Sequence, residues 1–169
     1  MRPIRAVALL VIAIAAVVWT VPVSAGTLVT YVAKAKPGSI IVETTARQLF
    51  FVIGDGKALR YPVGVGRVGR QWRGVSYIDG RFTLPNWSPP ADIRRDRPEL
   101  PDVIPGGSPA NPMGAAAMTL AGGNYAIHGT NAPASIGGFV SYGCIRMSNE
   151  DALDLMGRVR IGTRVEVLL

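Results

Sequence analysis

The sequence predicts a mainly β domain with one or two short helices, of the α+β class. Short runs of β-branched and aromatic residues recur along the chain between turn signals, as in strands. Only one segment, residues 148–159, has the spacing of apolar residues that is typical of a helix. The 169 residues suit one ordinary domain with a proper core once an N-terminal export signal is set aside.

The N-terminus has the three parts of a secretory signal peptide. The basic start MRPIR precedes an uncharged apolar run over residues 6–19, and small residues lead up to Ala25. An uncleaved membrane anchor is the alternative, but a span takes about 20 apolar residues and Pro22 interrupts the run early. We therefore expect residues 1–25 to be removed and the protein to reach the periplasm or cell envelope, with anchoring to the inner membrane only if the segment is retained.

The remaining chain is expected to hold a short linker, residues 26–38, and one domain, residues 39–169. The formal net charge of the whole chain is +7. An exported protein rarely meets nucleic acid, so this charge favours anionic envelope polymers, including cell-wall peptides with free carboxylates, as partners. The alternative is that the charge only keeps the domain soluble.

The strand predictions rest on β-branched and aromatic content and on turn residues at the strand ends. GDGK, residues 54–57, is a hairpin signal between two of these strands. The predicted strands cover residues 39–43, 48–53, 58–65, 74–84, 125–128 and 163–169.

The single predicted helix begins after Ser148. Ser148 is the expected N-cap, and Asp151, three residues later, completes an acidic capping pattern. Ala152, Leu153 and Met156 are expected to share the apolar face of this helix.

Residues 85–112, called here the proline-rich segment, differ from the rest of the chain. They contain eight of the 13 prolines, so they cannot form the interior of a sheet. A connection of this length in a compact domain is usually functional or disordered. Trp87 argues for order, because a large aromatic side chain normally packs against something. We expect a substrate-facing lid; the alternative is a floppy surface insertion.

The glycine-rich stretch GVGRVG, residues 64–69, is not interpreted as a dinucleotide site. A nucleotide fingerprint requires a helix after the glycines and an acidic residue about 20 positions later. The stretch that follows has no helical apolar stripe, and position 89 is Pro. The sequence therefore predicts no cofactor, and these glycines are assigned to tight turns.

The chain has one cysteine, Cys144, and one histidine, His128. Alone, each is weak evidence, because a lone cysteine is usually a small buried hydrophobe and a lone histidine a structural group. One histidine and one cysteine are also too few for the usual zinc ligand sets, so no metal site is predicted.

The context of these two residues favours catalysis. His128 ends a predicted strand, and Gly129 allows the backbone to turn there. The turn before Ile145 presents the thiol and offers successive backbone N–H groups, from Tyr142 to Cys144, that could stabilise an oxyanion. We expect the imidazole to raise the thiolate fraction and later to protonate a leaving amine, which makes the thiol the nucleophile.

HGTNAPASIGGFVSYGCIRMSNEDALDL resembles the signature of the L,D-transpeptidase catalytic domain (YkuD type), which is HGT, a loop, and then SHGC or SSGC with IRM. The segments YPVGVGRVG, WRG, PNWSPP, IPGGSPANPMG and GTRVEVLL are similar to that family's segments in the same order. The resemblance covers roughly residues 39–169 and implies a β-sandwich with a mixed sheet.

The resemblance implies a role for each residue of the motif. Cys144 would be the acyl-accepting nucleophile and His128 the proton acceptor and donor. Position 142 departs from the pattern, since Tyr142 stands where many members have His or Ser, so His128 would carry the acid–base work alone. The residues expected to support the oxyanion or the substrate are Ser141, Tyr142, Gly143, Arg146, Gly129 and Thr130.

The implied reaction is acyl transfer on peptidoglycan stem peptides. Cys144 would attack the amide that follows an L-centre, expel D-alanine, and pass the acyl group to the amine of a second stem. An envelope protein could supply the acceptor amine instead, and water as acceptor would make the protein a carboxypeptidase or amidase. A non-catalytic wall-binding module is the alternative from a different class.

Overall fold

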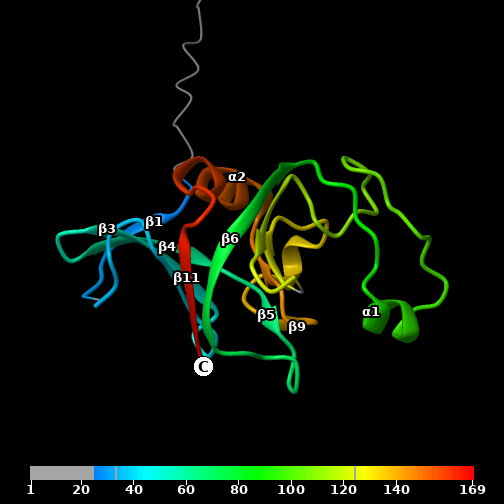
Figure 1. The fold of residues 1–169 in the computed structure, drawn as a ribbon, viewed down its shortest axis with the longest axis horizontal. Helices are drawn as coiled ribbons and strands as arrows, with labels where there is room; N and C mark the ends of the chain where they lie inside the picture. Colours follow the sequence, from blue (N-terminus) through cyan, green and yellow to red (C-terminus); the bar gives the residue numbers. More distant parts are fainter. Residues whose placement is uncertain (1–24, 33, 124) are drawn as a thin grey trace, which may run out of the picture.

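The computed structural model describes residues 25–32, 34–123 and 125–169 (Figure 1). Nine strands form one sheet in the order β1-β4-β3-β2-β11-β6-β7-β8-β10, and β5 and β9 form a small second sheet. The strands are β1 (Thr27–Thr30), β2 (Ile40–Glu43), β3 (Gln48–Gly54), β4 (Lys57–Pro62), β5 (Val65–Gly66), β6 (Gly74–Thr83), β7 (Ala116–Leu120), β8 (Ala126–His128), β9 (Phe139–Ser141), β10 (Ile145–Arg146) and β11 (Arg164–Leu168).

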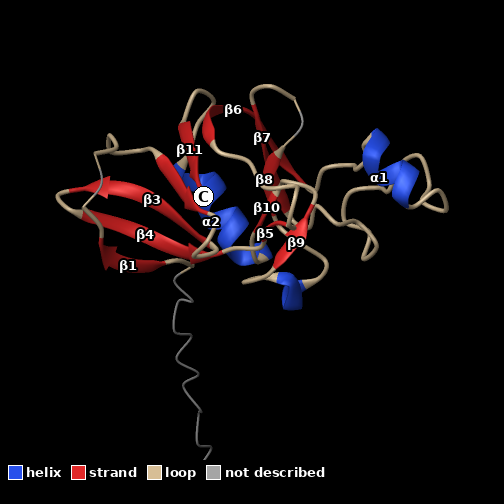
Figure 2. Cartoon of the chain, turned by 90° about the horizontal axis from the view of Figure 1, so that it is seen from below, coloured by secondary structure: helices blue, strands red, loops and turns tan. Residues whose placement is uncertain are grey.

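The large sheet is mixed, which confirms the predicted mainly β fold. β11 is parallel to β2 and β10 is parallel to β8, whereas the other pairs are antiparallel. β6 pairs with β11 on one side and with β7 on the other, and its register shifts between Ile78 and Gly80. Figure 2 shows β1, β3 and β4 on one side of the molecule and β7, β8 and β10 on the other. These two groups of strands are the two halves of one continuous sheet.

A single main core joins the two halves. Ile40 and Val42 of β2 point into it, while Ile41 points to a smaller cluster on the opposite face, as the alternation of a strand requires. Tyr61 of β4 is fully buried in the main core, and its hydroxyl donates a hydrogen bond of 2.6 Å to Asp154.

The predicted helix is α2 (Asn149–Arg158). Ser148 caps it, because its side chain accepts a hydrogen bond of 3.0 Å from the backbone N–H of Asp151. The buried face consists of Ala152 and Leu155, whereas Leu153 points outward with 43% of its surface exposed. The prediction of Leu153 on the apolar face was wrong, because residues three positions apart, not adjacent ones, share a face.

Several elements were not predicted from the sequence. β1 lies in the segment expected to be a linker, yet it pairs with β4 at the edge of the sheet. β7 is AAMTL, in which alanine has no preference for strands; burial between β6 and β8 decides its conformation. The N-terminal export signal lies outside the described residues. Within the described residues, no helix is long and apolar enough to cross a membrane.

The proline-rich segment is an ordered connection between β6 and β7. Thr83 at the end of β6 pairs with Ala116 at the start of β7, so the intervening chain leaves and re-enters the sheet at one place. Asn111 is buried there, and its side-chain amide donates hydrogen bonds to the carbonyls of Pro85 and Pro105, of 2.9 and 3.0 Å. The far part of the segment carries helix α1 (Ala91–Asp96), which lies at one end of the molecule in Figure 1. The proline-rich segment is therefore not a floppy surface insertion.

Candidate active site

The parallel pairing of β8 with β10 brings the histidine and cysteine motifs together. The two strands lie side by side (Figure 2), with Ile145 opposite Ile127 and Arg146 opposite His128 in the register of their pairing. Cys144 immediately precedes β10, so its side chain falls beside the first residue of β8, Ala126, whose backbone interacts with the thiol. Because alternate residues of a strand share a face, Ala126 and His128 lie on one side of β8. Continuing this register, Cys144 is level with Ala126, two residues before His128 on the neighbouring strand.

The ring of His128 is held by a backbone carbonyl. The side chain is almost fully buried, and its Nδ1 lies 2.6 Å from the carbonyl oxygen of Gly129. A carbonyl only accepts hydrogen bonds, so Nδ1 must carry the proton in this contact. In the neutral ring, Nε2 then keeps the lone pair and is the atom that can accept a proton.

The resting pair is neutral. Burial and, to a smaller extent, the positive charge of Arg146 lower the pKa of His128 to about 4, although the backbone carbonyls of Gly129 and Pro112 oppose this effect. Burial also raises the pKa of the Cys144 thiol, against a smaller opposing effect of Arg146. The expectation that the imidazole raises the thiolate fraction is therefore not met in the resting site, because desolvation disfavours both charged groups.

The turn that carries the thiol, residues 141–144, is held by hydrogen bonds within the turn and by one from a residue outside it. The hydroxyl of Ser141 donates to the carbonyl of Cys144 at 2.6 Å and accepts from the N–H of Gly143 at 3.0 Å. From outside, the indole N–H of Trp72 donates to the carbonyl of Gly143 at 2.9 Å. Gly143 has a φ of 123°, and a Cβ there would lie 2.2 Å from the ring of Tyr125. No other residue fits this position.

The N–H groups of the turn differ in their availability. That of Gly143 is taken by Ser141, as described above. Among the described residues, the backbone N–H groups of Tyr142 and Cys144 donate to no protein acceptor. These two groups, rather than that of Gly143, are free to bind a developing oxyanion.

Asn149, which the sequence analysis did not identify, holds the backbone that follows His128. Its side-chain oxygen accepts hydrogen bonds from the N–H groups of Ala115 and Thr130, both 3.0 Å long. A Cβ at Gly129 would lie 2.3 Å from the same oxygen, so the glycine allows Asn149 to approach. The position of Asn149 directly after the N-cap residue Ser148 was the only feature of the sequence that could have pointed to it.

Two adjacent cavities lie under the proline-rich segment. The Cys144 cavity, of about 420 Å³, is lined by Arg70, Pro90, Ala91, Asp92, Ile93, Gly123, Tyr125, Tyr142 and Cys144. The second, of about 370 Å³, is called here the arginine cavity because Arg67, Arg97 and Arg146 line it together with Trp87. Ile93 and Tyr142 line both cavities and so stand between them.

Tyr142 is the contact point of the proline-rich segment. Its hydroxyl donates a hydrogen bond of 2.7 Å to Asp96, which also receives one of 3.1 Å from Arg67. The guanidinium of Arg67 lies over the Tyr142 ring, 3.9 Å from its centre. A second ion pair of 2.9 Å joins Arg70 to Asp92, which lies on helix α1 as Asp96 does. The side chain at position 142 therefore holds the segment in place.

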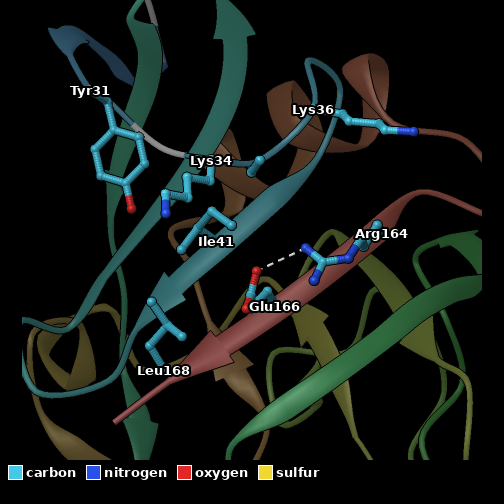
Figure 3. A pocket seen from close by; sticks show the side chains of 8 residues that line it. Tyr31, Lys34, Lys36, Ile41, Arg164, Glu166 and Leu168 are labelled. Atoms are coloured by element: carbon cyan, nitrogen blue, oxygen red, sulfur yellow. Dashed lines mark hydrogen bonds and ion pairs between the residues drawn. The ribbon is translucent and has the colours of Figure 1, made fainter.

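A third cavity, of about 690 Å³, shares no residue with the two described above. It lies on the outer face of the sheet, between Tyr31 and Lys34 on one side and strand β11 on the other (Figure 3). Within it, Arg164 is paired with Glu166 at 2.8 Å. Thr130 lines yet another cavity, near the start of α2, so the structure does not bring its side chain to Cys144.

Comparison with known proteins identifies the family. The model of the family described as "YkuD: L,D-transpeptidase catalytic domain" matches residues 37–167. The probable L,D-transpeptidase ErfK/SrfK of Escherichia coli is 37% identical over 138 residues, which are 76% of this chain and 43% of that protein. The putative L,D-transpeptidase YkuD of Bacillus subtilis is 36% identical over 131 residues, 78% of this chain and 66% of that protein. The chain belongs to the L,D-transpeptidase catalytic-domain family.

Solved structures support the fold. A cysteine-to-serine mutant of an Enterococcus faecium L,D-transpeptidase matches with a TM-score of 0.62 at 19% identity, covering 79% of this chain and 50% of that one. An L,D-transpeptidase from Mycobacterium smegmatis matches with a TM-score of 0.61 at 16% identity, covering 77% and 58%. The present chain spans less than half the length of its Escherichia coli relative.

Within this L,D-transpeptidase domain, the predicted site residues fall into groups. Cys144, Tyr142, Arg146 and Trp87 line the two adjacent cavities, while Ser141 and Gly143 shape the turn. His128 is almost fully buried and lines neither cavity. Four further residues near the site were not predicted from the sequence: Trp72 and Tyr125, whose rings stack 5.0 Å apart, and Asp96 and Asn149.

Proposed function

We propose that the protein is a cysteine-dependent L,D-transpeptidase that acts on peptidoglycan stem peptides. The observation that supports this proposal best is the register of β8 and β10, which pairs the strand that follows the partly buried Cys144 thiol with the strand that ends at His128, whose tautomer is fixed by Gly129. Membership of the L,D-transpeptidase family supports the substrate class.

The first step is attack on the donor. Nε2 of His128 accepts the proton of the Cys144 thiol while the sulfur adds to the carbonyl carbon of the amide after the L-centre. The carbonyl oxygen becomes an oxyanion and is bound by the N–H groups of Tyr142 and Cys144. Because both catalytic groups are neutral at rest, proton transfer accompanies attack instead of preceding it.

The second step releases the leaving group and forms the product. The carbon–nitrogen bond breaks, His128 returns its proton to the departing amine of D-alanine, and a thioester at Cys144 remains. The amine of a second stem then adds to the thioester carbonyl and loses a proton to His128. Collapse restores the thiol and leaves a new amide, so no ATP is required. An envelope protein with a free amine could replace the second stem.

Incubation of the purified protein with a tetrapeptide stem as donor and an amine-bearing stem as acceptor tests the proposal. Intact-protein mass should show one acyl group per chain, and product mass should show the cross-linked peptide. The Cys144→Ala variant is the control and should show neither. Hydrolysed donor as the sole product would indicate a carboxypeptidase, and binding without an acyl-enzyme would indicate a wall-binding module. Either result contradicts transpeptidation.

We also propose that the protein acts in the periplasm or cell envelope after export. This proposal rests on the basic and apolar N-terminal residues and on a substrate that lies outside the cytoplasm. N-terminal sequencing of protein from the envelope should find Gly26 as the first residue.

A further inference from the structure

The arginine cavity has an unbalanced positive charge. Arg67, Arg97 and Arg146 reach it from three separate parts of the chain, and no Asp or Glu lines it. Asp96 neutralises Arg67 by the ion pair of 3.1 Å described above. Two guanidinium groups therefore face the cavity without a carboxylate of the protein beside them.

Neither Arg97 nor Arg146 takes part in any of the ion pairs formed among the described residues. The residues outside the described part, 1–24, 33 and 124, contain no Asp or Glu that could supply a partner. Moreover, Nε of Arg146 is buried and has no hydrogen-bond acceptor among the described residues. A buried donor without an acceptor costs free energy, and an anion beside the Arg146 guanidinium would offset part of this cost.

The two arginines also act on each other. The positive charge of Arg97 lowers the pKa of Arg146, in addition to the effect of burial. Two like charges held near each other repel, and an anion between them removes the repulsion. Carboxylates suit this position because a planar guanidinium can donate two parallel hydrogen bonds to one carboxylate.

We infer that the arginine cavity is a carboxylate-binding subsite, in which Arg97 of the proline-rich segment and Arg146 of β10 bind the α-carboxylate of a peptide substrate. This inference rests on the proposed function. Trp87 supplies an apolar wall to the same cavity, and Val140 and Ile104 line it as well. Arg97 is thus a specificity-determining residue that a motif comparison does not reveal, because it lies outside the HGT and YGCIRM motifs.

The location fits a peptide that spans both cavities. Tyr142 and Ile93 border the Cys144 cavity and the arginine cavity, so a chain whose carbonyl lies at Cys144 can extend past them into the arginine cavity. A free α-carboxylate is available on the departing D-residue of the donor. The acceptor stem carries one as well. Both sources present the same group to the arginines, and the two are separated by amidating one peptide at a time.

The test uses Arg97→Gln, which removes the charge and keeps much of the length. Arg95→Gln is the matched control, because Arg95 lies on α1 and lines neither cavity. Binding of donor and acceptor peptides to the Cys144→Ala protein is measured by calorimetry, with each peptide as the free acid and as the carboxamide. Steady-state KM and kcat of the otherwise unaltered protein are measured with the same peptides.

We expect Arg97→Gln to weaken binding of one free-acid peptide about tenfold and to leave binding of its carboxamide within about twofold, as expected for loss of a charge-assisted hydrogen bond. KM should follow the same pattern while kcat changes little. The peptide that shows the effect is the source of the carboxylate. Equal losses for acid and carboxamide, or no loss for any peptide, would overturn the inference. Absence of an acyl-enzyme in the unsubstituted protein would instead refute the proposed function and leave the binding result standing.

Discussion

Arg146 faces His128 across the parallel pairing of β10 with β8. A permanent positive charge therefore stands next to the group that is proposed to accept a proton. Burial is the main cause of the low pKa of His128, and Coulomb repulsion between Arg146 and an imidazolium adds to it, so the ring stays neutral and can accept a proton. The same arginine lowers the pKa of the Cys144 thiol, so it favours the thiolate while it disfavours the imidazolium that forms when His128 accepts the proton.

The pH dependence of acylation should report this pairing. The imidazole must be neutral to accept a proton, so the rate should fall as the pH drops through the pKa of His128, which is about 4. Arg146→Gln removes a charge that lowers this pKa, so the fall should begin at higher pH. The measurement is acyl-enzyme formation against pH by intact-protein mass, with a carboxamide donor that makes no ion pair with Arg146.

Arg95→Gln serves as the control for this experiment, since it removes an equal charge on α1 without facing His128. An acid limb that stays at the same pH in Arg146→Gln would mean that the pairing does not control the ionisation of the histidine.

Cys144→Ala should abolish the covalent intermediate, because the chain contains no other cysteine. A carbapenem-type β-lactam, whose strained carbonyl is an acyl donor, should add once per chain to the unsubstituted protein and not at all to the variant. Peptide mapping should locate the adduct. Cys144→Ala should keep its melting temperature, and an adduct on any other residue would disprove the assignment of the nucleophile.

Trp87→Ala should weaken substrate binding more than it weakens the fold. Trp87 forms two backbone hydrogen bonds with Ile104, of 2.9 and 2.8 Å, and these do not depend on its side chain. The indole lines the arginine cavity, so its removal should raise KM about fivefold, the loss expected for one aromatic contact. Trp87→Phe should recover most of the affinity. A large fall in melting temperature with unchanged KM would make Trp87 a core residue.

Tyr142→Phe should loosen the proline-rich segment while leaving the turn at Cys144 intact. The variant loses the hydroxyl that donates to Asp96 but keeps the ring under Arg67. Hydrogen exchange of the amides in residues 91–96 should become faster, and exchange in α2 should not change. Asp96→Asn should show the same pattern. Identical exchange in Tyr142→Phe and the unsubstituted protein would show that this hydrogen bond does not hold the segment.

Asn149→Ala should lower the stability by about 1–3 kcal/mol, because the partly buried N–H groups of Ala115 and Thr130 lose their acceptor. Asn149→Asp keeps an oxygen in the same place and puts a negative charge at the start of α2, so it should remain close to the unsubstituted protein. Thermal unfolding measures both variants. Equal melting temperatures for the Ala and Asp variants would show that the oxygen contributes nothing.

The parts of the fold that could be predicted from the sequence are those set by neighbouring residues. The cap at Ser148 and the hairpin at residues 54–57 depend on short-range hydrogen bonds and φ preferences, and both occur in the structure. The order of the strands depends on pairings between distant segments. β7 in particular carries no local signal, because burial on both sides determines its conformation.

The residues of the site likewise divide into those that neighbouring residues made predictable and those that depend on distant parts of the chain. Cys144 and His128 could be identified because each is unique in the chain and has glycine beside it. Asp96 could not be connected with Tyr142, since 46 residues separate them and only the path of the proline-rich segment brings them together. The charge state of the pair could not be predicted either, because it depends on burial and on the position of Arg146 across the sheet.

The hydrogen bonds of Asn111 to Pro85 and Pro105 tie together distant parts of the proline-rich segment, and this has a consequence for how members of the family can diverge. Because the segment leaves and re-enters the sheet at adjacent residues of β6 and β7, its length and composition can change without moving any strand that carries Cys144 or His128. A replacement segment needs only to preserve that junction and to present its own side chains over the cavities. Side chains of the segment that line the cavities, such as Trp87 and Arg97, can thus vary without altering the strands that carry Cys144 and His128, and a graft of this segment between relatives should alter substrate preference without altering the catalytic pair.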